Sequence, residues 1–380
     1  MFSIVISAPN PFYLYVRDES DEWQITIKEI NEGNYDALKL HRVSFFLDVG
    51  LEYGTPMGFA FDGSMLVPRN PSLKSADDAI DCFNRVKAAL LLGGLQLDQT
   101  TSSELAFGDL SDLGYFRYTD PHGSTALLNR AFGELGAGSL LSIVLDKPRR
   151  ITKNEVEGAF KSGSLVFSNL SRVNAAFLVT AFSCAAKHEH RSALIFGWVA
   201  LEQVVEHLWT DCFLSKKDYF LSENRKQSLK KLRNVSQKIE MLRQSEILSD
   251  KAYTSLHVAR KARNKFAHNG GQVSREDAVE CLKALLIAID IYSEQRGIPS
   301  VGLAPLSVFQ GKSKEKQTDE NTAVEAGAID WSDVKYWREI FKIPGDENWA
   351  GDEEKLDGIL LKDVSAEIKA TNHSKKMGGV

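Results

Sequence analysis

The spacing of hydrophobic residues changes near residue 150. Before it, short runs of β-branched and aromatic residues alternate with polar turn segments, which is typical of antiparallel strands. A Ser-Ala-Asp-Asp cap, an amphipathic stretch at residues 79–92 and two glycines predict a helix. Further short strands are expected to about residue 145, so residues 1–150 are predicted to form a β-rich α+β domain. The clearest strand runs are residues 2–7, 12–16, 23–30, 43–48 and 58–61.

After residue 150 the hydrophobic period lengthens to about 3.6 residues, as in amphipathic helices. The third of these helices has a broad apolar stripe that predicts packing into a bundle. Residues 151–297 are therefore predicted to form an all-α helical bundle, and the fold class is α+β. The stripe consists of Leu194, Trp198, Leu201, Val205, Leu208 and Trp209. The predicted helices are residues 154–160, 164–187, 192–213, 223–244, 250–268 and 274–295.

Residues 298–380 are predicted to be a flexible acidic tail. Residues 312–326 have almost no aliphatic side chains and are interpreted as a linker. The segment after them contains several aromatic residues, among them Trp331 and Trp349, and is interpreted as a docking segment. It could fold back onto the rest of the chain or bind a regulatory partner protein.

Composition is ordinary for a globular protein, with 380 residues and 43% hydrophobic residues. The longest apolar runs are too short to span a bilayer and no signal-peptide profile is present, so we expect a cytoplasmic protein that does not enter a membrane. The four cysteines lack Cys-x-x-Cys spacing, which argues against a zinc site and a disulfide framework.

The net charge of −5 is unevenly distributed along the chain. Residues 214–268 contain 14 basic and five acidic residues, whereas residues 317–367 contain five basic and 14 acidic ones. The basic segment fits an electrostatic surface for RNA phosphates, with Lys230, Lys231, Lys261 and Lys265 as candidate contacts. A solvated, lysine-rich helix pair explains the same charge equally well. A further hypothesis is that the acidic segment covers the basic one and inhibits it.

The strongest chemical signal is Arg263-Asn264-Lys265-Phe266-Ala267-His268. Helical periodicity extends to His268, and Gly270 and Gly271 then supply a helix stop. His268 is thus expected in the last turn, where the helix dipole favours an imidazolium. Five residues along a helix correspond to about 140°, so Arg263 and His268 converge only because arginine is long.

This pattern resembles the Arg-x(4–6)-His motif of the HEPN superfamily, in particular the Apea-like branch found in prokaryotic defence proteins. The Asn after the Arg, the glycine stop and an upstream Trp198-Val199-Ala200-Leu201-Glu202 helix occur in the order typical of that family. The resemblance covers roughly residues 155–296. A second Arg-x(4)-His pattern begins at Arg117, but its proline and following glycine favour a turn, and it is discounted.

The resemblance implies a metal-independent endoribonuclease without a cofactor, an anti-phage or toxin-type effector that acts on RNA as a homodimer. It also implies His268 as general acid/base and Arg263 as the cation that stabilises the phosphate. The chemistry agrees, because cleavage through the 2′-hydroxyl needs a base, an acid and a cation, which two copies of one Arg/His pair would supply. The N-terminal domain would then be a sensing or regulatory module.

Three other residues are assigned to the same site. Asn264 lies four residues before His268 and could orient the imidazole or contact a phosphate. Glu202, an acid within an apolar stripe, is expected to pair with Arg260 or Arg263.

Structural interpretations stay open for the same residues. His268 could only interact with helix carbonyls, and Arg263 could only balance Glu202. His257 and His207 are interpreted as surface or packing residues, and the His188-Glu189-His190 run as a solvated loop rather than a metal site. The alternative for the whole protein is a non-catalytic HEPN module that binds RNA or a protein.

Overall fold

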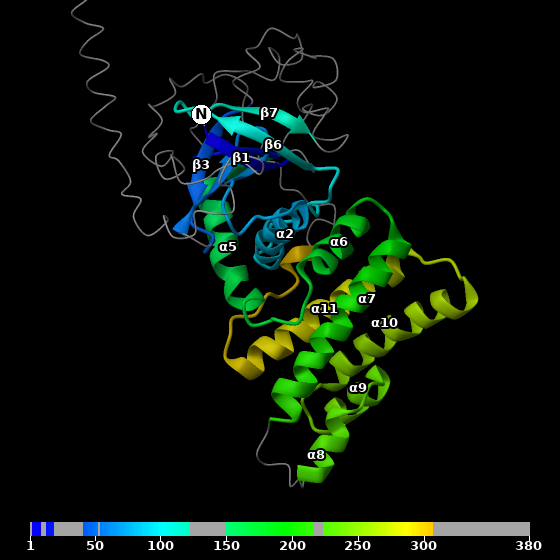
Figure 1. Ribbon diagram of the computed structural model, residues 1–380. Helices are drawn as coiled ribbons and strands as arrows, with labels where there is room; N and C mark the ends of the chain where they lie inside the picture. The colour runs from blue at the N-terminus through cyan, green and yellow to red at the C-terminus, as the bar shows by residue number, and fades with distance from the viewer. Residues whose placement is uncertain are drawn as a thin grey trace, which may run out of the picture. The chain divides into compact units, whose positions relative to one another are not determined.

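The computed structural model describes residues 2–8, 13–18, 41–51, 54–121, 149–215 and 223–306. Figure 1 shows the elements that these residues form. The chain divides into two units. The described residues of Met1–Phe83 and Thr100–Glu155 belong to the first, and those of Asn84–Gln99 and Val156–Gln317 to the second.

The first unit is built on a six-stranded antiparallel sheet. Its strand order is β3-β4-β5-β1-β6-β7, so the N-terminal strand β1 lies inside the sheet between β5 and β6. A separate parallel pair joins β2 to β8. The strands are β1 (Phe2–Ser7), β2 (Tyr13–Val16), β3 (Val43–Leu47), β4 (Met57–Ala60), β5 (Met65–Pro68), β6 (Leu105–Leu110), β7 (Phe116–Pro121) and β8 (Arg149–Thr152).

The two outer strands of this sheet are also joined to each other. An isolated bridge pairs Arg42 with Tyr115, the Val43 N–H donates to the Gly114 carbonyl at 3.0 Å, and the Phe116 N–H donates to the His41 carbonyl at 2.8 Å. At this end the sheet therefore closes on itself and leaves fewer unpaired backbone groups at its edges.

The second unit is a helical bundle whose centre is α7. This helix packs against α6, α10 and α11, and it continues without a break into a π-helical turn, η3. The stripe predicted from the sequence is confirmed, since all six of its residues are buried. The elements are α5 (Lys153–Phe167), α6 (Ala175–Ala186), α7 (His190–His207), η3 (Leu208–Phe213), α8 (Glu223–Lys230), α9 (Val235–Gln244), α10 (Asp250–Asn269) and α11 (Arg275–Arg296).

Two of the predicted helices are each two helices, and an asparagine starts the second helix in both cases. The helix predicted at residues 164–187 is interrupted after Phe167, and Asn174 caps α6 by accepting the Phe177 N–H at 3.2 Å. The helix predicted at residues 223–244 is interrupted after Lys230, and Asn234 caps α9. Asparagine competes with the helix for backbone N–H groups, which explains why the periodicity alone was misleading.

The helix start predicted from the Ser-Ala-Asp-Asp cap is confirmed, and α11 starts with the same kind of cap. α2 (Ala76–Leu92) begins where the Asp78 N–H donates to Ser75 Oγ at 3.2 Å and the Ser75 N–H donates back to Asp78 Oδ2 at 2.8 Å. Ser274 and Asp277 make the equivalent reciprocal pair at the start of α11. Each pair satisfies two backbone donors that have no partner inside the helix.

The remaining sequence predictions have mixed outcomes. Residues 117–121 of the discounted second motif belong to β7, and its His122 and the glycine that follows lie outside the described residues. No disulfide joins any two of the four cysteines, all of which are described, and three of them are buried. Among the described helices, none is long and apolar enough to cross a membrane. The strand predicted at residues 23–30 and the acidic tail beyond residue 306 lie outside the described residues.

Helices α2 and α5 approach each other closely at Gly163. A Cβ atom added to Gly163 would lie 1.8 Å from the carbonyl oxygen of Ala89, whereas one added to Gly158 in the same helix would meet nothing within 4 Å. We expect Gly163→Ala to lower the free energy of unfolding by about 1–3 kcal/mol, because the helices must move apart. Gly158→Ala should raise it by up to about 1 kcal/mol through helix propensity. Urea unfolding of both variants checks this, and equal effects would contradict the close contact.

Candidate active site

The candidate site lies at the C-terminal end of α10. Ser249 caps the start of this helix by accepting the Ala252 N–H at 3.3 Å. Its end is set by Gly270, which has a left-handed backbone (φ 61°) and donates its N–H to the Phe266 carbonyl at 3.0 Å. A glycine adopts this conformation without steric cost. The predicted stop is therefore confirmed, and His268 lies in the last turn.

Burial of one face of α10 determines how the site residues are presented. Leu256 and Ala259 are fully buried in the core of the bundle. Arg263 and Asn264 are half-buried, and His268 is exposed. The His268 ring makes no hydrogen bond to the described part of the chain, so both ring nitrogens can reach a ligand.

In the part of the chain that the structure describes, Arg263 is held by two neighbours, neither of which is an acid. Its Nη1 donates to Asn264 Oδ1 at 3.1 Å, and its Cζ lies 5.9 Å from the centroid of the Trp198 ring. Asn264 thus contacts the arginine rather than the imidazole, which differs from one of the two roles expected for it. With Oδ1 engaged by the arginine, the Asn264 amide keeps its N–H donors for an anion.

The prediction that Glu202 forms an ion pair with Arg260 or Arg263 is wrong for the described structure. Glu202 Oε1 instead accepts a hydrogen bond from the Trp198 indole N–H at 2.6 Å, one helical turn earlier in α7. A nearly buried indole N–H needs an acceptor, and the carboxylate at i+4 supplies one. Glu202 is only half-buried, so its charge does not require a cationic partner.

Arg260 belongs to a different cluster, between α9 and α10. Its guanidinium donates to Ser236 Oγ and lies 3.0 Å from His257 Nε2. His257 stacks on Tyr253, whose hydroxyl donates to Glu240 Oε1 at 2.6 Å. Partial burial, Arg260 and Lys261 all lower the pKa of His257, so its imidazole is neutral near pH 7 and accepts from the arginine. Arg260 therefore joins two helices and does not support Arg263.

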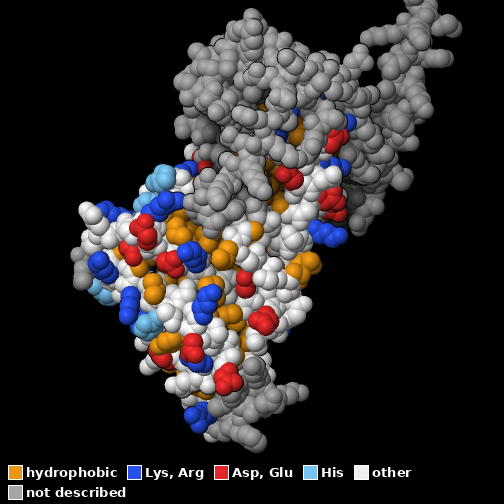
Figure 2. Space-filling model, turned by 180° about the vertical axis from the view of Figure 1, so that it is seen from behind, with side chains coloured by type: hydrophobic (Ala, Val, Ile, Leu, Met, Phe, Trp, Pro, Cys, Tyr) orange, Lys and Arg blue, Asp and Glu red, His pale blue; other side chains and the backbone are white. Residues whose placement is uncertain are grey.

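The four candidate RNA-binding lysines are all exposed but fall in two places. Lys261 and Lys265 share the outer face of α10 with His268, at spacings of four and three residues. Lys230 and Lys231 lie at the end of α8, which Figure 1 places at the opposite end of the bundle from the loop joining α10 to α11. On the face in Figure 2, basic side chains gather toward one edge of the bundle among acidic and hydrophobic ones.

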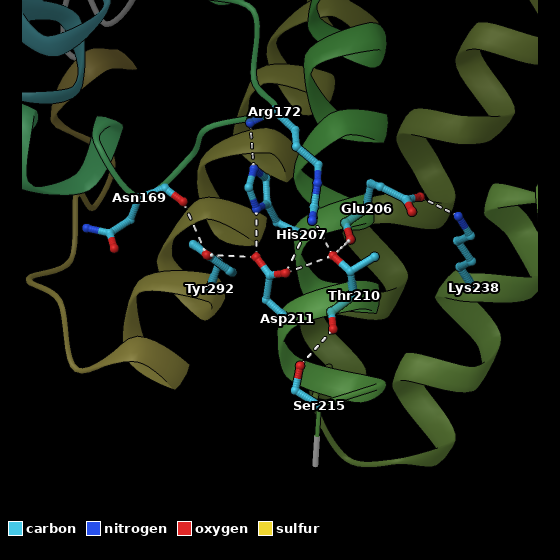
Figure 3. Close-up of polar contacts among 9 residues, drawn as sticks. All are labelled: Asn169, Arg172, Glu206, His207, Thr210, Asp211, Ser215, Lys238 and Tyr292. Atoms are coloured by element: carbon cyan, nitrogen blue, oxygen red, sulfur yellow. Dashed lines mark hydrogen bonds and ion pairs between the residues drawn. The ribbon is translucent and has the colours of Figure 1, made fainter. Parts of the chain in front are cut away.

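A polar network in the bundle surrounds His207, which was interpreted from the sequence as a surface or packing residue (Figure 3). His207 is buried; its Nε2 accepts the Arg172 backbone N–H at 3.0 Å, and its Nδ1 lies 2.9 Å from Asp211 Oδ2. The same carboxylate oxygen accepts from the Tyr292 hydroxyl at 3.1 Å. Both imidazole nitrogens are occupied, so His207 links the α5–α6 connection, α7 and α11 rather than acting on a substrate.

Part of this network was recognisable in the sequence. His207 and Asp211 are four residues apart, the spacing at which side chains meet on a helix. Arg172 and Tyr292 come from distant segments, and no local pattern marks them. The π-helical turn at Leu208–Phe213 carries Thr210 and Asp211, and such turns often mark sites where a side chain must be re-aimed.

Comparisons of the chain with the models of known families, with curated proteins and with solved structures find no match. In the part of the chain that the structure describes, no three His, Cys, Asp or Glu side chains are grouped so that they could hold a metal ion.

Asp211 should make the bundle sensitive to acid. Partial burial opposes ionisation of Asp211, but hydrogen bonds from His207 and Thr210 and the charge of Arg172 outweigh it and hold the pKa below 3.8. A carboxyl with a lowered pKa stabilises the fold above its unfolded-state pKa, and this contribution disappears as the pH falls through the folded-state pKa.

We expect Asp211→Asn to cost about 1–3 kcal/mol of unfolding free energy at pH 7. The difference from the unsubstituted protein should shrink as the pH falls below about 4. Chemical unfolding followed by circular dichroism between pH 7 and pH 3 measures this, with the exposed Glu294→Gln as control. A difference that stays constant with pH would show that the Asp211 charge is not involved.

Proposed function

We propose that the chain is a HEPN-type endoribonuclease that cleaves RNA without a metal ion, with His268 as the general acid/base and Arg263 as the cation at the phosphate. One observation carries this proposal. The two residues lie within the last two turns of one helix and the imidazole is exposed, while among the described residues the guanidinium is bound by an amide and an aromatic ring and by no carboxylate. A guanidinium that no carboxylate neutralises keeps its full attraction for phosphate.

The reaction we infer is an internal transesterification. One imidazole takes the proton of the ribose 2′-hydroxyl, and the 2′-oxygen attacks phosphorus. The bond from phosphorus to the 5′-oxygen breaks, and a second, protonated imidazole donates its proton to that oxygen. The products are a 2′,3′-cyclic phosphate and a 5′-hydroxyl. Arg263 stabilises the negative charge that accumulates on the phosphoryl oxygens in the transition state.

A homodimer supplies the second imidazole in this scheme. Each chain carries a single Arg263/His268 pair, and a twofold interface would place two pairs around one phosphate. Lys261 and Lys265, on the same outer face as His268, would bind the RNA backbone on either side of the scissile bond. The observations of this site favour a role in RNA cleavage, and a place in prokaryotic defence rests on the resemblance to the Apea-like branch alone.

Cleavage of a labelled RNA of mixed sequence in EDTA tests the proposal. We expect His268→Ala to lower kcat by about 10²–10⁴-fold through loss of acid–base catalysis. Arg263→Ala should lower it by about 10²–10³-fold through loss of charge stabilisation. The specific activity per chain should also fall when the protein is diluted below the dissociation constant of the dimer.

The matched control is His257→Ala, which removes another histidine of α10 that has a neutral imidazole and a structural partner. It should leave kcat within about threefold once folding is verified by circular dichroism. RNA that is bound but cleaved by none of the proteins would contradict the nuclease and favour the non-catalytic module.

A further inference from the structure

The contact between Arg263 and Trp198 joins two helices of the bundle. Trp198 belongs to α7 and is 3% exposed, whereas Arg263 belongs to α10 and is half-buried. The Arg263 Cζ lies 5.9 Å from the indole centroid, within the range in which the negative face of an aromatic ring attracts a cation. The buried indole is therefore a fixed surface against which a long, flexible side chain is held.

Glu202 binds the N–H at the edge of the same ring. Its carboxylate accepts the indole N–H at 2.6 Å, a short, charge-assisted hydrogen bond. A negative acceptor at the N–H shifts electron density toward the ring and strengthens its attraction for a cation. The carboxylate also fixes the rotation of the indole.

This arrangement positions the arginine without neutralising it. A direct bidentate ion pair with Glu202 would occupy the fork of the guanidinium that is needed for phosphate. The Trp198 ring and Asn264 Oδ1 restrain the guanidinium instead. Restraint matters because Arg263 and His268 leave the helix about 140° apart, so the arginine must adopt one particular conformation to act beside the imidazole.

We propose that Trp198 and Glu202 are positioning residues for Arg263, with the carboxylate acting through the indole. This inference rests on the proposed function, because it assigns the two residues a role in the reaction that Arg263 assists. They do not touch the RNA, and their effect on the rate passes through the arginine alone.

The kinetic test is a double-mutant cycle. We expect Glu202→Gln and Trp198→Phe each to lower kcat by about 3–30-fold, the range of one cation–π contact, with a smaller change in KM. In an Arg263→Ala background neither change should lower kcat further, because the group through which they act is gone. If Glu202→Gln or Trp198→Phe lowers kcat by the same factor in the Arg263→Ala background, the inference is overturned.

A matched control separates positioning from packing. Trp209 is fully buried in the same bundle and stacks on Phe213 at 4.5 Å, and its indole N–H has no hydrogen-bond acceptor among the described residues. Trp209→Phe is thus the same chemical change at a site away from Arg263, and it should leave kcat unchanged. If it lowers kcat as much as Trp198→Phe, the loss reflects packing and the inference fails.

An NMR measurement distinguishes failure of the positioning role from failure of the proposed function. In ¹⁵N-arginine-labelled protein, the Arg263 Nε–H resonance, assigned by its absence in Arg263→Ala, should carry the ring-current shift of the indole. It should move in Trp198→Leu and in Glu202→Gln but not in Trp209→Phe. Absence of RNA cleavage by the unsubstituted protein would overturn the proposed function and the role that depends on it, even with this shift present. If the unsubstituted protein cleaves RNA but the Arg263 resonance moves in neither Trp198→Leu nor Glu202→Gln, only the positioning role is overturned.

Discussion

Burial of Leu256 and Ala259 in the bundle core is the constraint on which the site depends. Once that face of α10 is packed, helical geometry assigns every other side chain its direction. Lys261, Lys265 and His268 are exposed, and Arg263 is left half-buried beside α7. Gly270 then ends the helix directly after the histidine turn, so the imidazole stands at the negative end of the helix dipole.

The surroundings of the bundle histidines separate structural from chemical roles. His207 is buried with both nitrogens hydrogen-bonded, and His257 is neutral and accepts from Arg260. His268 has neither constraint within the described residues, and no described carboxylate pairs with Arg263 of the same helix. Under the proposed function, this helix end is where a ligand phosphate would find donors.

Local patterns predicted what local physics determines. The period of hydrophobic residues predicted strands followed by helices along the chain. The serine cap of α2 marked the start of that helix, and the glycine stop placed His268 in the last turn of α10. Breaks at Asn174 and Asn234 were missed because a capping asparagine resembles any other polar residue in an amphipathic pattern. The predicted partner of Glu202 was wrong because charge suggested an arginine, whereas the carboxylate accepts the indole N–H four residues earlier. Contacts such as Arg172 with His207 depend on tertiary packing, which one sequence does not reveal.

The central claim is that Arg263 and His268 promote attack by a ribose 2′-hydroxyl. The most direct measurement uses a DNA strand that contains one ribonucleotide, incubated with the protein in EDTA. We expect a single cut directly 3′ of the ribonucleotide, with a 2′,3′-cyclic phosphate on one product and a 5′-hydroxyl on the other. Cuts at deoxyribonucleotides, or a 5′-phosphate on the product, would contradict it.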